Sequence, residues 1–169
     1  MNTPTIVATT LPPVPVTGNR FVYYGVSLLK AYGNSERHIV RRLAEDYLRV
    51  AERHADSRHY GNAIHQANTV LGLLELERGR INKAEEYLVR AADTPGSPQL
   101  SGFGPNMLLA SKLLEAGRSR TVLEYLNRCG KLWKLSFGKL WQWKMAIRLG
   151  RRPDFGANLT HLLDYKSFG

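Results

Sequence analysis

The feature that most constrains the fold of this chain is an internal repeat. Residues 68–91 align without gaps to residues 106–129, and ten of the twenty-four aligned positions are identical. The longest identical runs pair Gly79-Arg80 with Gly117-Arg118 and Glu86-Tyr87-Leu88 with Glu124-Tyr125-Leu126. The two copies are offset by 38 residues. Self-similarity at such a period is typical of stacked structural repeats, in which each unit buries its apolar face against its neighbours.

The stretches between the Gly, Pro and Asn residues favour helices, because they are long and show no alternating strand pattern. The sequence therefore predicts an all-α fold. The expected helices are Arg20–Tyr32, Ser35–Ala55, Ser57–Arg78, Ile81–Ala92, Pro105–Ala116, Ser119–Leu132, Phe137–Leu149 and Asp154–Tyr165.

The repeats themselves are predicted to be helical hairpins. Gly79 and Gly117 suit the left-handed residue that ends the first helix of each hairpin. A further copy of the Tyr-Leu phrase, at Tyr47-Leu48, lies upstream, and Gly150-Arg151 repeats the Gly-Arg pair downstream. We therefore expect one domain, residues 20–169, of three to four antiparallel helix pairs at about 20–55, 57–92, 105–132 and 137–165.

The best-matching unit resembles the tetratricopeptide repeat family. The residues that carry the resemblance are Leu71-Gly72, Ala84, Ala91 and Pro95. Of these, Gly72, Ala84 and Ala91 are the small residues that let neighbouring helices approach closely. The resemblance implies an α-α hairpin solenoid whose first helices line a concave surface. It also implies that this surface binds a peptide or helix of another protein.

On this interpretation, one face of the first helices carries the partner-binding residues. Its members share a helical spacing of three and four, and they are Asn62, Gln66, Thr69, Leu73, Met107 and Ser111. The expected function is that of a non-catalytic adaptor or chaperone-like module. In the alternative interpretation, the same residues pack on a neighbouring helix or face water.

The chain is basic, with 24 Lys and Arg against 14 Asp and Glu, a formal net charge of +10. Residues 125–153 contain no acid and include three Trp residues. The basic residues there are Arg128, Lys131, Lys134, Lys139, Lys144, Arg148, Arg151 and Arg152. Cations beside planar rings are typical of nucleic-acid surfaces, so an RNA- or DNA-associated protein is the alternative function. An acidic partner protein would suit the same charges.

The aromatic residues of this segment also allow a structural interpretation. Phe137, Trp141, Met145 and Leu149 recur every four residues, which predicts a core stripe with the basic residues on its solvated face. The segment 94–105, rich in Gly, Pro and Ser, is expected to be a long loop with Phe103 exposed.

No catalytic residues, metal site or cofactor are predicted. His54, His59 and His65 are separated by five and six residues, which does not place them on one helix face. The single Cys129 is expected to be a buried thiol. Residues 1–19, rich in Pro and Thr, are expected to form a flexible leader, and the lack of a signal peptide or long apolar run favours the cytoplasm. Unmatched repeat edges would also allow homo-oligomers.

Overall fold

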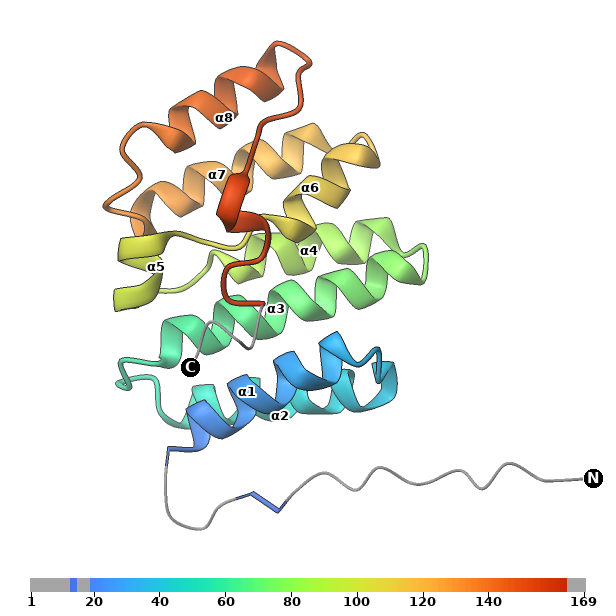
Figure 1. Cartoon of the computed structure of the whole chain (residues 1–169), viewed down its shortest axis with the longest axis vertical. Coiled ribbons are helices and arrows are strands. Elements are labelled where there is room, and N and C mark those ends of the chain that lie inside the picture. Colours follow the sequence, from blue (N-terminus) through green and yellow to red (C-terminus); the bar gives the residue numbers. More distant parts are fainter. Residues whose placement is uncertain (1–12, 15–18, 164–169) are drawn as a thin grey trace, which may run out of the picture.

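The computed structural model describes residues 13–14 and 19–163 of the chain, and these residues form an all-α fold. Figure 1 shows the helices stacked in successive layers along the long axis of the molecule. The helices are α1 (Arg20–Gly33), α2 (Arg37–Arg53), α3 (Tyr60–Glu77), α4 (Ile81–Ala91), α5 (Pro98–Phe103), α6 (Leu108–Glu115), α7 (Ser119–Leu132) and α8 (Lys139–Arg148). A single turn of 3-10 helix, η1, follows at Gly156–Leu159.

Three pairs of consecutive helices make up most of the stack. α1 packs on α2, α3 on α4 and α6 on α7, while α2 with α3 and α4 with α7 join one pair to the next. α8 packs on α7 at the end of the stack. Apart from α5, the helices between residues 20 and 149 therefore lie close to where the sequence predicts them.

The Gly-Arg pairs end three helices in the same way. Gly79, Gly117 and Gly150 all adopt left-handed backbone angles, with φ of 73°, 77° and 70°. At each pair the Arg N–H donates to the carbonyl five residues earlier, as Arg80 does to Glu75 at 2.9 Å. This geometry satisfies carbonyls that the helix end leaves free, and it confirms the predicted glycine caps. By this criterion α8 corresponds to α3 and α6, the first helices of their pairs.

Small residues allow the second pair to pack closely. Ala84 and Ala91 of α4 are completely buried. At Gly72 of α3, a Cβ atom would lie 2.3 Å from Leu109 Cδ2 of α6, so any larger residue would have to displace the buried Leu109 side chain. Two core clusters result, one over residues 21–74 and one over residues 73–155, and they meet at α3.

The repeated Tyr-Leu phrase lies on the second helix of each pair, but its tyrosines are not equivalent. Tyr47 and Tyr125 are buried, and the Tyr125 hydroxyl donates to the Asn106 carbonyl at 2.8 Å. Tyr87 is half-buried, with the cations of Lys83 and Arg90 within 6 Å of its ring centre. Tyr87 still packs against the first core cluster and Leu88 is buried, so the phrase is a packing feature in all three copies, with the tyrosine fully buried in two of them.

The predicted helix Asp154–Tyr165 is not formed by its described residues. Residues 151–155 are irregular, η1 follows, and the chain continues in turns to residue 163. Figure 1 shows this part running back from α8 toward α3 instead of forming a second helix against α8. The prediction of a fourth helical hairpin at about 137–165 is therefore wrong. Residues 164–165 of the predicted helix lie outside the described residues. So do most of residues 1–19, which the sequence predicts to be a flexible leader.

The predicted core stripe on α8 is also wrong. Phe137, Trp141 and Leu149 are exposed, whereas Leu140, Trp143 and Ile147 of the same region are buried. Leu140, Trp143 and Ile147 share a core cluster with buried residues of α7, and because α8 ends the stack, no further helix layer covers its opposite face among the described residues.

The segment 94–105 is not a loop throughout, because it contains α5. Pro98 occupies the first turn, and the Ser97 hydroxyl accepts from the Leu100 N–H at 3.0 Å, a typical helix start. Phe103, at the end of α5, is exposed as predicted.

Candidate functional site

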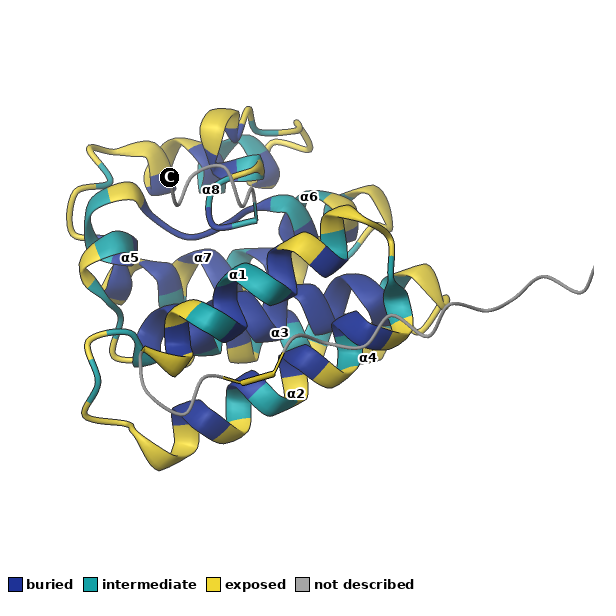
Figure 2. Cartoon of the chain, turned by 60° about the horizontal axis from the view of Figure 1, so that its bottom comes forward, coloured by how far each residue is buried: buried dark blue, intermediate teal, exposed yellow. Residues whose placement is uncertain are grey.

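The residues predicted to form an open concave surface are almost all covered. Asn62, Gln66, Thr69, Leu73 and Met107 are each at most 5% exposed, and Ser111 is partly exposed. They lie on α3 and around the start of α6, so we refer to this surface as the α3/α6 face. Figure 2 shows the buried residues gathered between the layers of helices.

The C-terminal segment, residues 155–163, covers the middle of the α3/α6 face, whereas Asn62 at one end accepts from the Ser97 hydroxyl at 2.5 Å. The Gln66 side-chain amide donates to the Leu162 carbonyl at 3.0 Å. The Asn106 amide donates to the carbonyls of Leu159 at 3.1 Å and His161 at 2.7 Å. The bound groups are backbone carbonyls, so this contact holds a polypeptide segment largely independently of its side chains.

One side chain of the segment binds the α5–α6 connection in return. Asn158 is 4% exposed, and its amide donates to the carbonyls of Phe103 and Pro105, both at 3.0 Å. The main-chain carbonyl of Asn158 accepts from the Met107 N–H at 2.8 Å. Asn158 therefore satisfies three backbone groups at once, which makes it the central polar contact of the segment.

Apolar side chains anchor the two ends of the C-terminal segment. Phe155 packs edge-on against Trp143 with ring centres 5.0 Å apart. Leu162, 2% exposed, adopts a left-handed φ of 61°, and Leu163 packs against both core clusters. The segment is thus held by buried apolar surface as well as by hydrogen bonds.

A buried histidine supports the floor of this site. The His65 Nε2 atom accepts from the Asn106 N–H at 2.8 Å, so Nδ1 carries the proton and donates to the Ala91 carbonyl at 2.9 Å. Burial lowers the pKa of His65 to about 4. A neutral imidazole therefore joins α3, α4 and the start of α6.

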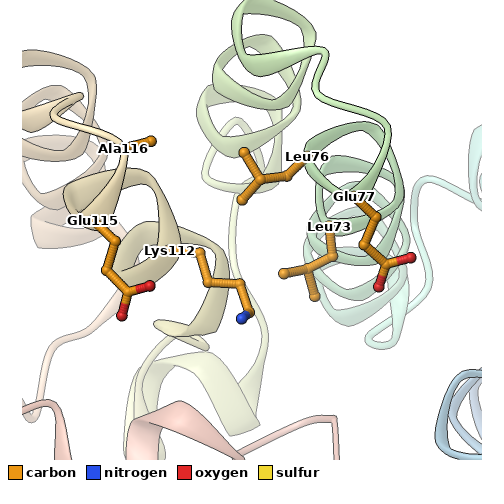
Figure 3. Close-up of a pocket in the computed structure, with 6 residues that line it drawn as sticks. All are labelled: Leu73, Leu76, Glu77, Lys112, Glu115 and Ala116. Carbon is orange, nitrogen blue, oxygen red and sulfur yellow. The ribbon is translucent and has the colours of Figure 1, made fainter.

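The α3/α6 face continues into a pocket that remains open. This cavity has a volume of about 430 Å³ and lies between the C-terminal ends of α3 and α6. Figure 3 shows Leu73 and Leu76 facing α6. Charged side chains of Glu77, Lys112 and Glu115 surround it.

The predicted basic residues lie along α7, α8 and the connections that follow each of them. Two of them pair with acids: Arg128 with Glu124 at 3.0 Å and Arg152 with Glu115 at 3.4 Å. The others have no acidic group within ion-pairing distance among the described residues. They are Lys131, Lys134, Lys139, Lys144, Arg148 and Arg151.

The histidines and the cysteine, which could ligate a metal or react, form no metal or catalytic cluster among the described residues. Within the described residues, no three His, Cys, Asp or Glu side chains gather in a way that could hold a metal ion. Cys129 is fully buried, and burial raises the pKa of its thiol. The core holds Trp133 and Trp143, but not Trp141.

The sequence did not predict a binding role for Asn106 or Asn158. It also did not predict that His65 would join α3 to α4 and the start of α6. Asn106 matches Asn68 in the repeat, but Asn68 donates within its own helix to the Ile64 carbonyl. The identity therefore gave no indication of the role of Asn106.

No known protein family, curated protein or solved structure matches this chain. The helices that the structure describes include none long and apolar enough to cross a membrane.

Proposed function

We propose that this protein is a non-catalytic binding module, built as a tetratricopeptide-like solenoid, whose α3/α6 face holds a short segment of a partner protein. The observation that carries the proposal is that this face already holds a polypeptide segment, residues 155–163 of the same chain. A partner segment would bind in place of that segment.

The nature of the contacts supports this function. Gln66 and Asn106 donate to three backbone carbonyls, and the Met107 N–H donates to a fourth. Every peptide offers such carbonyls. Selectivity would come from the apolar positions equivalent to Phe155 and Leu162, and from an asparagine equivalent to Asn158.

Binding of a peptide in trans tests the proposal. The probe is a fluorescent peptide of residues 154–163, titrated with the full chain carrying Asn158→Ala, in which the C-terminal segment is weakened. We expect saturable binding that is tighter than to the unchanged chain, because the competing internal segment has lost its central hydrogen bonds.

Variants of the face should act in the opposite direction. Adding Gln66→Ala to the Asn158→Ala chain should weaken peptide binding about five- to thirtyfold, the range for loss of a buried hydrogen bond. Gln142→Ala is the matched control, because Gln142 is exposed on α8. The function is rejected if the peptide does not bind, or if the Gln66 and Gln142 variants bind it equally.

A further inference from the structure

A second cavity of about 430 Å³ lies on the other side of the C-terminal segment, at the end of α5. We refer to it as the aromatic cavity. Its lining comes from α5, the α7–α8 connection and the C-terminal segment, and the residues are Gly102, Phe103, Trp133, Leu135, Phe137, Lys139, Ala157, Asn158, Thr160 and His161.

Two of the aromatic rings that line this cavity are open to solvent. Phe103 is 69% exposed and Phe137 is 86% exposed. Phe137 also has a φ of 47°, and a bulky side chain in the left-handed region is costly. Residues held in such backbone conformations are concentrated at functional sites. Exposed rings at a cavity offer flat surfaces on which a planar ligand group can stack.

One polar side chain that lines the cavity, that of His161, is incompletely hydrogen-bonded. The His161 Nε2 atom is buried and has no hydrogen-bond partner among the residues that the structure describes. Its ring lies 5.7 Å from that of Phe103. An unsatisfied buried nitrogen costs free energy.

The charge around the cavity is positive. Lys139 lines it, with its Nζ atom 5.8 Å from the centre of the Trp133 ring. Lys131 and Lys134, on the same α7–α8 stretch, are exposed and lack an acidic group within ion-pairing distance among the described residues. Free cations beside exposed rings attract an anionic chain that carries planar groups.

We propose that the aromatic cavity binds single-stranded nucleic acid, with a base stacked on Phe103 and Phe137 and phosphates beside Lys131, Lys134 and Lys139. Single-stranded nucleic acid combines planar rings with a phosphate at every nucleotide, which are the two properties this surface complements. An acidic peptide would complement the lysines but would leave the exposed rings without an equivalent partner. Four residues of the C-terminal segment line this cavity, so a peptide that displaced the segment would also remove one wall of the cavity. The phenylalanines and lysines that the test addresses lie outside the α3/α6 face.

The test compares three fluorescent probes on the full chain by anisotropy: an oligothymidylate of about twelve nucleotides, an abasic oligomer of the same length, and an oligoglutamate. We expect the oligothymidylate to bind at least about fivefold more tightly than the abasic oligomer, because stacking adds to the phosphate contacts. Its affinity should fall steeply with salt.

Variants locate the binding. Phe137→Ala and, separately, Phe103→Ala should remove the preference for the oligothymidylate over the abasic oligomer. Trp141→Ala should keep it, because Trp141 is exposed but does not line the cavity. Lys134→Glu should weaken both nucleic-acid probes, whereas Lys30→Glu on α1 should not. Equal binding of the two nucleic-acid probes, tighter binding of oligoglutamate, or no effect of either Phe variant would overturn the proposal.

Discussion

The side-chain amide of Gln66 donates a buried hydrogen bond to the carbonyl of Leu162, ninety-six residues later in the chain. This bond joins the middle of the helical stack to the C-terminal segment. It shows why the α3/α6 face is covered: the chain provides a segment that the face can hold. The proposed function rests on this relationship, because a surface that holds one segment through its backbone can hold another.

Asn158→Ala should release the C-terminal segment without unfolding the stack. The substitution removes two buried hydrogen bonds and leaves the carbonyls of Phe103 and Pro105 unpaired, so we expect a loss of about 1–3 kcal/mol in the local stability of the segment. Amide hydrogen exchange measures this as faster exchange at Met107, whose N–H donates to Asn158. Asn127→Ala on the exposed face of α7 is the control and should change nothing at Met107. Unchanged exchange in both variants would show that Asn158 does not hold the segment.

Glu75→Gln should destabilise the stack strongly. The buried Glu75 carboxylate pairs with Arg41 of α2, and lies 3.4 Å from Arg80 and 3.9 Å from Arg78. Burial raises the pKa of Glu75. The hydrogen bond and charge of Arg41, with the charges of Arg80 and Arg78, together lower it by more, so the net pKa is lowered. We expect a loss of roughly 3 kcal/mol in chemical denaturation, because the guanidinium groups remain without their acid.

The control for Glu75 is Glu77, two residues later on α3. Glu77 makes a single exposed ion pair with Arg37 at 2.9 Å, so Glu77→Gln should cost less than about 1 kcal/mol. Because the pKa of Glu75 is lowered in the folded state, its contribution is complete above the unfolded-state pKa and is lost as the pH falls through the folded value. Equal losses for the two variants would contradict the assignment.

His65 should make the fold sensitive to mild acid. Its pKa is lowered from 6.5 to about 4, so the folded state binds the proton less readily than the unfolded state. The contribution of neutral His65 is complete above pH 6.5 and decreases as the pH falls toward 4, by up to roughly 3 kcal/mol. His65→Gln should flatten the stability profile between these values, measured by urea denaturation at several pH values. His59 and His161 act in the same direction and remain in the variant. An unchanged slope would show that His65 does not control it.

Gly104→Ala should be much more disruptive than Gly102→Ala. Gly104 has a φ of 86°, and an added Cβ atom would lie 2.5 Å from the Trp133 ring. An added Cβ at Gly102 would meet nothing within 4 Å. We expect a loss of about 2–4 kcal/mol at Gly104 from strain and overpacking, and less than about 1 kcal/mol at Gly102. Thermal denaturation followed by circular dichroism compares the two. Similar melting temperatures would contradict the packing of α5 on Trp133.

The helices could be predicted from the sequence because their signals are local. Gly79, Gly117 and Gly150 mark helix ends whatever the rest of the chain does, and Ala84 and Ala91 mark close packing. On α8, however, the sequence offers two apolar stripes. Only the position of the helix at the end of the stack determines that Trp143 is buried and Trp141 is not.

The candidate site could be predicted only in part, because its decisive contacts join distant parts of the chain. Gln66 was predicted as a binding residue, but the pattern around it gave no indication of what it binds. The C-terminal segment lacks a sequence period, and Asn158 is recognisable as an anchor only once the carbonyls of Phe103 and Pro105 are placed beside it. A short polar residue in an irregular segment carries no such information in the sequence.

The central claim is that a partner segment and residues 155–163 bind the same face. Hydrogen exchange of the full, unchanged chain tests it most directly, measured with and without a saturating unlabelled peptide of residues 154–163. We predict faster exchange in residues 155–163 of the protein when the peptide is bound, with no change in the buried amides of α3. Peptide binding that leaves the exchange of residues 155–163 unchanged would contradict the claim.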